Sequence, residues 1–208
     1  MTEVKKLVVG PLEENCYILK NEHRAVLVDP GAGGTRILNA IKSLCIKPEA
    51  ILITHAHFDH IMAVAWVKKE YPEIPVYAYI KEKEVFEDPD KSLLRNIGGA
   101  HEIKDIIYLE DNEVIEPAGI KIKVIATPGH TVGSACYLLE GENVLLSGDT
   151  LFLESAGRTD FPTGSTRELT HSIREILMKL PDDTVVYPGH GDETTIRHER
   201  THNFVMFT

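Results

Sequence analysis

The 208-residue sequence predicts an α/β fold in which sheets lie inside and helices lie outside. Two successive blocks of short apolar runs are each followed by segments whose apolar residues have helical spacing. Hydrophobic residues make up 43% of the chain, which is enough to bury a full core. No low-complexity linker divides the sequence, and α/β chains of this length often form one unit. We therefore expect one domain spanning residues 1–208.

The first block opens with a predicted antiparallel meander. Turn-prone residues 11–15 and 21–24 separate three short apolar runs. These runs are Lys6–Val9, Cys16–Leu19 and Ala25–Val28. A glycine-containing loop, Asp29–Gly34, then leads to a helix predicted over Thr35–Leu44, with Thr35 as its cap.

A short buried strand, Ala50–Ile53, carries the chain into a run rich in histidine. Beyond that run, the apolar spacing and Pro72 predict a helix, then a strand, then a second short helix. We expect these elements over Met62–Tyr71, Val76–Ile80 and Lys81–Phe86.

The second block repeats this order of strands followed by helices. Its four predicted strands are Ile106–Leu109, Ile120–Ile125, Ser134–Leu139 and Val144–Ser147. Apolar residues at helical spacing predict a long helix over Thr166–Leu180, which Pro181 ends. A strand over Thr184–Tyr187 and a helix over Thr195–Phe204 complete the chain.

Charge and cysteine content restrict the class of protein. A formal net charge of −10 argues against a nucleic-acid partner, although bound dications would still permit a small anionic substrate. Cys16, Cys45 and Cys136 are odd in number and lack CxxC spacing, which indicates reduced thiols in a cytoplasmic protein. The N-terminal residues show no pattern of a signal peptide or a membrane span. The oligomeric state is left open.

The run His55-Ala56-His57-Phe58-Asp59-His60 is the strongest functional signal. Residues two apart in an extended segment project to the same side, so His55 and His57 can bind one metal ion. Where the chain turns into a helix, Asp59 and His60 point in a new direction, and a second ion could bind beside the first.

Four ligands from one loop do not complete two coordination spheres. Three other strand-to-loop junctions, each with a glycine, offer His130, Asp149 and His190. Considered alone, the His55–His60 run could be a polar loop that arose by chance. Considered together with these three junctions, that explanation becomes the minor one. Isolated histidines are usually surface or hydrogen-bonded residues, and we interpret the remaining five in that way. They are His23, His101, His171, His198 and His202.

With these residues in place, the sequence resembles the metallo-β-lactamase-fold superfamily, and most of all its small glyoxalase II-like (hydroxyacylglutathione hydrolase-like) hydrolases. The segments Asn15–Leu19, Val28–Gly31 and Pro188–His190 also carry the resemblance. It implies a four-layer αββα sandwich with two metal ions at one edge of the sheets. His55, His57 and His130 would bind the first ion, Asp59, His60 and His190 would bind the second, and Asp149 would bridge them. Nitrogen-rich ligation favours zinc, while mixed His/Asp spheres also suit iron or manganese.

The implied reaction is hydrolysis of an acyl-thiol compound similar to S-lactoylglutathione. A hydroxide shared by the two metal ions would attack the carbonyl carbon, and Asp59 would both bind metal and orient that hydroxide. Asp29 has two interpretations, because it could orient a ligating histidine or could simply form the turn before Pro30-Gly31. The resemblance favours the first of these.

Substrate recognition is less clearly marked. Arg158 matches the position of a basic thiol-binding residue in the family and could pair with a substrate carboxylate, but it could equally pair with Asp160. Asp160 replaces the aromatic residue of that motif, and Gly191-Asp192 follows His190 where the glutathione-specific pattern has an aromatic residue. Glutathione is therefore not established as the thiol.

Three rival functions remain at this point. Persulfide dioxygenases resemble the chain, including its run Gly157–Phe161, and use one iron held by the equivalents of His55, His130 and Asp149. Lactone or β-lactam hydrolysis needs the same hydroxide but a different pocket. The third rival is a protein-interaction module in which the metal ions have only a structural role. Such a module would need fully coordinated metal ions, without an open position for water.

Overall fold

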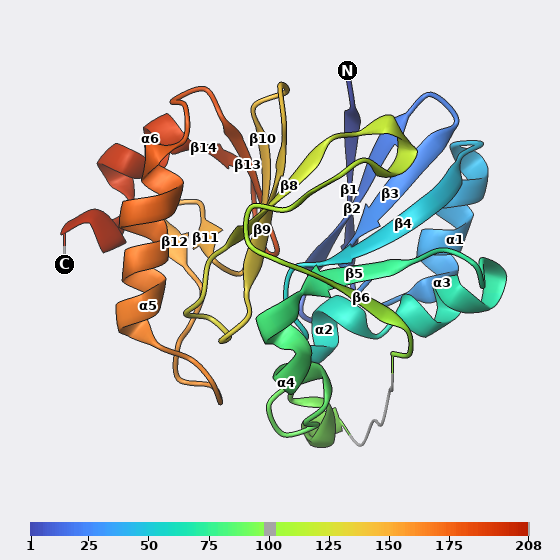
Figure 1. Cartoon of the computed structure of the whole chain (residues 1–208), viewed down its shortest axis with the longest axis horizontal. Helices are drawn as coiled ribbons and strands as arrows, with labels where there is room; N and C mark the ends of the chain where they lie inside the picture. The colour runs from blue at the N-terminus through green and yellow to red at the C-terminus, as the bar shows by residue number, and fades with distance from the viewer. Residues whose placement is uncertain (98–102, 208) are drawn as a thin grey trace.

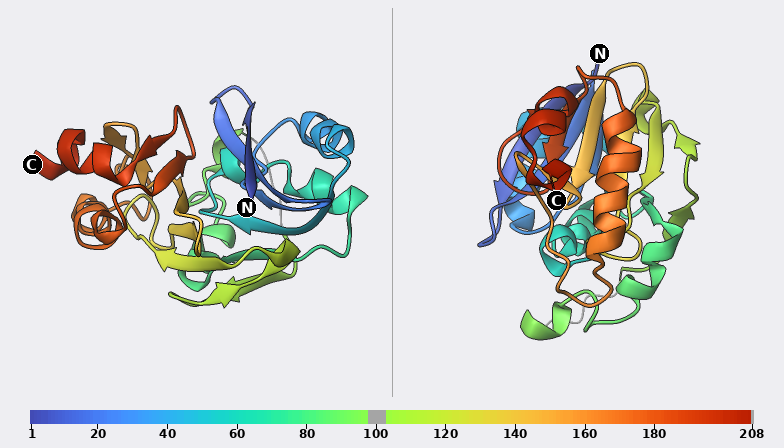
Figure 2. Two further views of the ribbon diagram at one scale, coloured as in Figure 1. Left: turned by 90° about the horizontal axis from the view of Figure 1, so that it is seen from above. Right: turned by 90° about the vertical axis from the view of Figure 1, so that its left-hand side faces the viewer.

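The computed structural model describes residues 1–97 and 103–207. Two six-stranded sheets face each other, and helices cover the outer face of each sheet (Figure 1). Helix α1 (Gly34–Ser43) and the C-terminal helices lie at opposite ends of the molecule in the left view of Figure 2. This arrangement confirms the predicted α/β fold class and the four-layer αββα sandwich.

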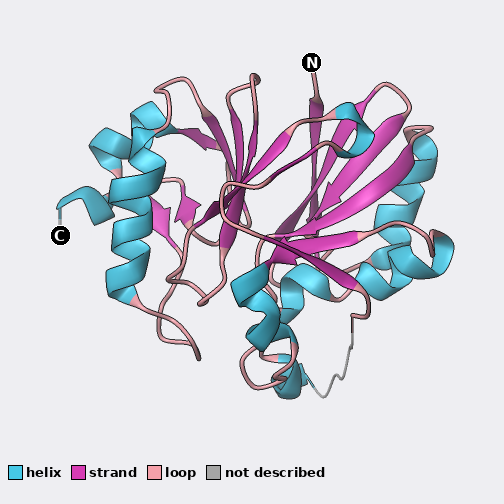
Figure 3. Ribbon diagram, viewed as in Figure 1, coloured by secondary structure: helices cyan, strands magenta, loops and turns pink. Residues whose placement is uncertain are grey.

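The first sheet has the strand order β1-β2-β3-β4-β5-β6. Strands β1 (Glu3–Val9), β2 (Glu14–Asn21) and β3 (Arg24–Val28) form the predicted antiparallel meander. The next strands, β4 (Lys47–Ile53), β5 (Val76–Tyr79) and β6 (Ile106–Leu109), then continue the sheet in parallel. Helices α1 and α3 (Val64–Glu70) connect the parallel strands and cover their outer face (Figure 3).

The second sheet has the order β14-β13-β10-β9-β8-β7 and is antiparallel except for the β10–β13 pair. Its strands are β7 (Val114–Ile115), β8 (Ile122–Ala126), β9 (Ala135–Leu139), β10 (Val144–Gly148), β13 (Val185–Pro188) and β14 (Thr194–Thr195). A small ribbon of β11 (Leu151–Phe152) and β12 (Ser155–Ala156) follows β10. Helices α5 (Thr166–His171) and α6 (Ile196–His202) cover the outer face of this sheet.

Short helical turns lie between these elements and after the last of them. They are α2 (Phe58–Ile61), η1 (Ile80–Glu82), α4 (Lys83–Phe86), η2 (Leu94–Ile97), η3 (Pro117–Gly119), η4 (Ser172–Ile176), η5 (Leu177–Lys179) and η6 (Phe204–Phe207). Among the described residues, no helix has the length and apolar character needed to cross a membrane.

Alternate residues of the central strands serve two different cores. On β2, Cys16 and Ile18 pack toward the helices, whereas Tyr17 and Leu19 pack between the sheets. Strands β3 and β4 alternate in the same way, because successive side chains of a strand point to opposite faces. Both faces are buried, so these strands are continuous apolar runs rather than alternating ones.

The helix predicted over Met62–Tyr71 is wrong in its bounds. Within that range the structure has α3 (Val64–Glu70), and Met62 and Ala63 form a break between it and the preceding helix α2 (Phe58–Ile61). The backbone N–H of Ala63 donates to the carbonyls of Pro30 (2.9 Å) and Gly31 (2.7 Å), so it does not continue the pattern of α2. The contact of Ala63 with this distant loop therefore separates α2 from α3.

Two other helix predictions need correction. Gly33, in a left-handed conformation, is the N-cap residue of α1, so Thr35 is not the cap. The long helix predicted over Thr166–Leu180 is present as α5, a π-helical turn (η4) and a 3₁₀ turn (η5). Ser172, at the start of the π turn, donates its hydroxyl to the carbonyl of Pro128 (2.8 Å).

Tyr137 provides a test of how the two sheets are joined. Its fully buried ring lies between the sheets, and its hydroxyl donates to the carbonyl of Ile53 at 2.7 Å. We expect Tyr137→Phe to lower the free energy of unfolding by about 1–3 kcal/mol, because the buried carbonyl loses its donor. Denaturant unfolding would measure this, with Tyr77→Phe, on β5, as the control. Equal stabilities of the two variants would contradict the prediction.

Candidate metal centre

The sequence-predicted site residues gather where strands of both sheets end. Strand β4 leads directly into the histidine run, while β8, β10 and β13 precede His130, Asp149 and His190 respectively. Strands β8, β10 and β13 point in one direction, because β9 lies antiparallel between β8 and β10 while β10 and β13 are parallel. Their carboxyl ends therefore meet at one edge.

Among the described residues, four groups of three have ligand atoms that all lie within 4.8 Å of one another. One consists of His55, His60 and Asp149, and one of Glu14, Asp29 and His60. The other two match the predicted ligand sets and are called the first and second groups below. The first group is His55, His57 and His130, and the second is Asp59, His60 and His190. In the first, His57 Nδ1 and His130 Nε2 are 2.9 Å apart. In the second, His190 Nε2 lies 3.3 Å from Asp59 Oδ2. Each group is compact enough to hold one metal ion.

Asp149 lies between the two groups. Its Oδ2 is 3.6 Å from His130 Nε2 and 3.7 Å from His190 Nε2, and its Oδ1 is 3.4 Å from His60 Nε2. A Cβ atom at Gly189 would lie 2.3 Å from this carboxylate, so only glycine permits the backbone to approach so closely. This explains why a glycine directly precedes His190.

Several buried polar atoms of the cluster have no hydrogen-bond partner among the described residues. They are the Nε2 atoms of His55, His57 and His60 and Oδ1 of Asp149. A buried polar atom without a partner is costly, and imidazole nitrogens and carboxylate oxygens are ordinary metal ligands. The donor set therefore fits bound metal cations.

The opposite ring nitrogens of the histidines are held by the protein. His60 Nδ1 contacts Asp29 Oδ2 (3.0 Å), and His55 Nδ1 contacts the hydroxyl of Thr54 (3.1 Å). The Nδ1 atoms of His130 and His190 donate to the carbonyls of Arg158 (2.8 Å) and Leu12 (3.1 Å). Such contacts orient a ring and direct its other nitrogen toward a metal.

Asp29 has the geometry expected of a residue that orients a ligating histidine. Its Oδ1 accepts from the backbone N–H of Thr54 (2.7 Å), and its Oδ2 accepts from the Thr54 hydroxyl (2.6 Å). The same Oδ2 faces His60, so the buried carboxylate links the end of β4 to that ring.

Electrostatics divide the histidines into two sets. Burial, reinforced by the neighbouring histidines, lowers the pKa of His55 well below its ordinary value and that of His57 to about 3. Burial also lowers the pKa of His130. These three rings are therefore neutral at pH 7, which is the form that binds metal. For Asp149, burial acts to raise the pKa, but His60 and His130 lower it below its ordinary range.

For His60 and His190, the nearby carboxylates raise the pKa by more than burial lowers it. Burial acts to lower the pKa of His60, but the charges of Asp149 and Asp59 raise it well above its ordinary value. Asp59 and Asp149 also raise the pKa of His190 against the effect of burial. The second group therefore collects the negative charge that a dication would neutralise.

Arg158 is already paired in the structure. Its Nε lies 2.6 Å from Asp160 Oδ1, and a second guanidinium nitrogen lies 2.5 Å from Asp160 Oδ2. The guanidinium also lies 4.0 Å from the centre of the Phe161 ring, which contacts the ring of His57. The ion-pair alternative foreseen for Arg158 is thus present, and Phe161 connects the pair to the edge of the cluster.

Sequence reasoning missed two buried glutamates beside the cluster. Both carboxylate oxygens of Glu14 lack a hydrogen-bond partner among the described residues, and Oε1 lies 3.9 Å from His60 Nδ1. Glu82 contacts the loops that carry His57 and His130. Neither residue has a sequence signal that marks it as buried, since both stand among other charged residues.

The remaining histidines are not part of these groups, as far as the described chain extends. His198 pairs with Glu154 (2.9 Å) and stacks on His202 at a ring separation of 4.3 Å. His101 lies outside the described residues.

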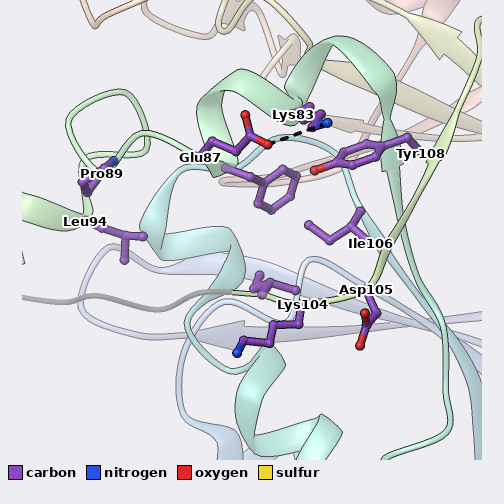
Figure 4. Close-up of a pocket in the computed structure, with 10 residues that line it drawn as sticks. Lys83, Glu87, Pro89, Leu94, Lys104, Asp105, Ile106 and Tyr108 are labelled. Atoms are coloured by element: carbon purple, nitrogen blue, oxygen red, sulfur yellow. Dashed lines mark ion pairs between the residues drawn. The ribbon is translucent and has the colours of Figure 1, made fainter.

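A cavity of about 900 Å³ is separate from the cluster. Lys83, Glu87 and Tyr108 are among the residues that line it, and Figure 4 shows the ion pair between the first two. No residue of the histidine–aspartate cluster lines this cavity. A smaller cavity of about 200 Å³ is lined by Asp59 together with Leu12, Phe58, Met62 and other residues.

Comparisons with known proteins agree with the geometry. Residues 9–190 match the family model described as the metallo-beta-lactamase superfamily. A probable metallo-hydrolase of Streptococcus pyogenes serotype M6 is 36% identical over 196 residues, which cover 91% of this chain and 84% of that protein. Hydroxyacylglutathione hydrolase GloC of Haemophilus influenzae is 31% identical over 205 residues, covering 96% of each.

Solved structures extend the comparison to the fold. BLEG-1 B3 metallo-beta-lactamase has a TM-score of 0.92 at 38% identity, covering 99% of this chain and 100% of that one. TTHA1623, crystallised in a di-iron-bound form, has a TM-score of 0.83 at 33% identity and covers 96% and 98%. Since the family match spans most of the sequence, the chain belongs to the metallo-β-lactamase superfamily and is a metallo-hydrolase.

Proposed function

We propose that the chain is a thioester hydrolase with two divalent metal ions, acting on hydroxyacyl-thiol compounds similar to S-lactoylglutathione. The observation that carries the proposal is the placing of Asp149 between two compact ligand groups. The thioester is supported by the relative named hydroxyacylglutathione hydrolase, which aligns with nearly the whole chain.

The proposed ligands of the first ion are His55, His57 and His130, and those of the second are Asp59, His60 and His190. Asp149 would bind both. Two such ions supply a hydroxide at neutral pH and polarise a carbonyl oxygen. Nitrogen-rich ligation favours zinc, and the di-iron form of TTHA1623 makes iron the alternative to test.

The protein's own residues would orient the reactants. Asp59 has two sets of surroundings. Its Oδ2 contacts His190 in the second group, and its side chain also lines the 200 Å³ cavity. We propose that Asp59 accepts the hydrogen bond of the attacking oxygen and directs its lone pair at the carbonyl carbon. Asp29 would keep His60 in the orientation that this arrangement requires.

The cavity beside Asp59 suits an acyl group. Leu12, Phe58, Met62 and Ile97 contribute apolar surface to it, and its volume of about 200 Å³ is small. An apolar wall next to the proposed nucleophile-orienting residue would hold the acyl part of a substrate by burial of nonpolar surface. We propose that the acyl chain, rather than the thiol, occupies this cavity.

The test combines metal analysis with a substrate screen. The protein would be loaded separately with zinc, iron and manganese, and metal per chain would be measured. Each form would then be assayed with S-lactoylglutathione, hydroxyacyl esters of other thiols, a lactone and a cephalosporin. We expect two ions per chain and a higher kcat/KM for the thioesters than for the other two classes.

Other outcomes would identify the rival reactions. One iron per chain with oxygen uptake that depends on a persulfide would overturn the hydrolase proposal. Faster turnover of the cephalosporin would indicate a β-lactamase, the activity printed in the name of BLEG-1. Metal binding with no turnover of any compound would favour an interaction module.

Arg158 gives a separate prediction about the thiol. We propose that a substrate carboxylate competes with Asp160 for its guanidinium. Arg158→Ala should then raise KM for glutathione thioesters roughly tenfold, which corresponds to the lower end of the free energy of a charge-assisted hydrogen bond. KM for thioesters of uncharged thiol carriers should stay unchanged. Steady-state kinetics on both substrate classes would measure this. An equal KM for parent and variant on glutathione thioesters would show that Arg158 serves only the ion pair.

A further inference from the structure

Glu82 is a buried carboxyl group that the proposed reaction does not use. It is the last residue of η1, between β5 and α4, and its side chain is 0% exposed. No ion pair to Glu82 is present among the residues that the structure describes. A buried carboxyl without a cation needs hydrogen bonds to offset its desolvation.

Those hydrogen bonds come from the two loops that carry the first ligand group. Oε1 accepts from the backbone N–H of Ala56 at 2.7 Å. Oε2 accepts from the hydroxyl of Thr131 (2.7 Å) and from the backbone N–H of Gly133 (3.1 Å). Ala56 stands between His55 and His57, and Thr131 directly follows His130. One carboxyl group therefore ties together two segments that are far apart in sequence.

The second loop is shaped to reach Glu82. A Cβ atom at Gly133 would lie 2.0 Å from the backbone nitrogen of Glu82, so this close approach requires glycine. Ser134 Oγ accepts from the backbone N–H of Thr131 (3.0 Å) and lies 2.7 Å from its hydroxyl. The Thr131–Ser134 turn is thus held in a shape that presents two donors to the carboxyl group.

We propose that Glu82 is a positioning residue that sets the separation of His57 and His130, and through it the affinity of the first metal ion. The ring nitrogens of these histidines are 2.9 Å apart, and each belongs to one of the two loops that Glu82 joins. Glu82 does not contact the proposed ion itself. The inference rests on the proposed role of His55, His57 and His130 as metal ligands, but not on the thioester as substrate.

Glu82→Gln is the sharpest substitution, because it keeps size and shape while removing one accepting oxygen. If the amide nitrogen faces the first loop, it meets the N–H of Ala56, and if it faces the second, it meets the N–H of Gly133. One backbone donor loses its acceptor in either orientation. Burial raises the pKa of Glu82 to about 8 while the three hydrogen bonds lower it, but both backbone donors remain in either protonation state.

The experiment is a titration of the metal-free full chain with Co²⁺, followed by absorption and by competition with a chelator. We expect the parent to bind two ions, and Glu82→Gln to bind one of them roughly 10- to 100-fold more weakly, the range found for residues that orient metal ligands. Glu84→Gln is the matched control, since Glu84 is an exposed neighbour that pairs with Lys91 (2.8 Å). It should bind both ions as the parent does.

A merely structural role would give a different result. Glu82→Gln would then lower the Tm of the metal-free protein but leave both Co²⁺ affinities and the absorption spectrum within twofold of the parent, which would overturn the proposal. If Glu82→Gln does not fold, Thr131→Val replaces it, with Thr131→Ser as the variant that restores the hydroxyl. Weaker binding in the first and recovery in the second would support the proposal, and equal affinities would overturn it.

Failure of the two proposals can be told apart. A parent protein that binds no Co²⁺ would overturn the inference about Glu82 together with the metal assignment. A parent that binds two ions but hydrolyses no thioester would overturn the proposed substrate and leave the Glu82 titration fully informative.

Discussion

Asp59→Ala should remove nearly all of the proposed thioesterase activity while leaving the fold in place. Asp59 lies in the short helix α2 at the edge of the sandwich, contacts His190 and lines the small cavity. Its loss would remove both a ligand and the group that orients the attacking oxygen. We expect kcat/KM to fall by about 10²- to 10⁴-fold, the range for a positioned acid–base group. Steady-state kinetics on the best thioester of the screen would measure it.

The control for this prediction is Asp192→Asn. Asp192 is also an acidic residue near His190, but its side chain is exposed and lies 3.6 Å from Lys6. Its substitution should leave kcat/KM within twofold of the parent. If Asp59→Ala retains full activity with an unchanged Tm, Asp59 has no part in the reaction.

Asp149→Asn should have the largest effect on metal content. The carboxylate contacts histidines of both ligand groups, at 3.6 Å for His130, 3.4 Å for His60 and 3.7 Å for His190. Asparagine offers one weakly ligating oxygen and no charge, so neither ion would be held as tightly. We expect an affinity loss of more than about 100-fold, beyond the range for residues that act through another ligand. Metal per chain after gel filtration would measure it.

The interpretation of Asp149→Asn depends on comparison with a one-site variant. His57→Ala removes a ligand from the first group only, so it should keep one ion per chain where Asp149→Asn keeps fewer. Two tightly held ions in Asp149→Asn would show that Asp149 does not join the sites. Loss of a single ion from both variants would also contradict a bridging role.

The central strands could be predicted because their signal is local. In the central parts of β2, β3 and β4, both faces are buried, so consecutive residues are apolar and each run is visible without knowledge of its neighbours. The break between α2 and α3 could not be predicted, because it depends on hydrogen bonds from Ala63 to Pro30 and Gly31. Strands of two residues, such as β7 and β14, are too short to show a periodic pattern.

The gathering of the site could be predicted for a similar reason. The histidine run and the junctions where a glycine precedes His130, Asp149 and His190 are conspicuous in the sequence, and the structure brings all seven residues together. Glu82 gives the contrasting case. It stands in the run Lys81-Glu82-Lys83-Glu84, which has the composition of a solvent-exposed turn, and only the tertiary contacts to Ala56 and Gly133 show that it is buried.

The division of ligands between the two sheets has a consequence for stability. Under the proposed assignment, each ion takes ligands from the segment after β4 and from segments after strands of the second sheet, so neither half of the sandwich supplies all the ligands of either ion. Bound metal would then stabilise the packing of the two halves against each other. Free metal at a hundred times its Kd would add about 2.7 kcal/mol to the free energy of unfolding. A cell's metal supply would thus influence how long the chain survives as well as how fast it works.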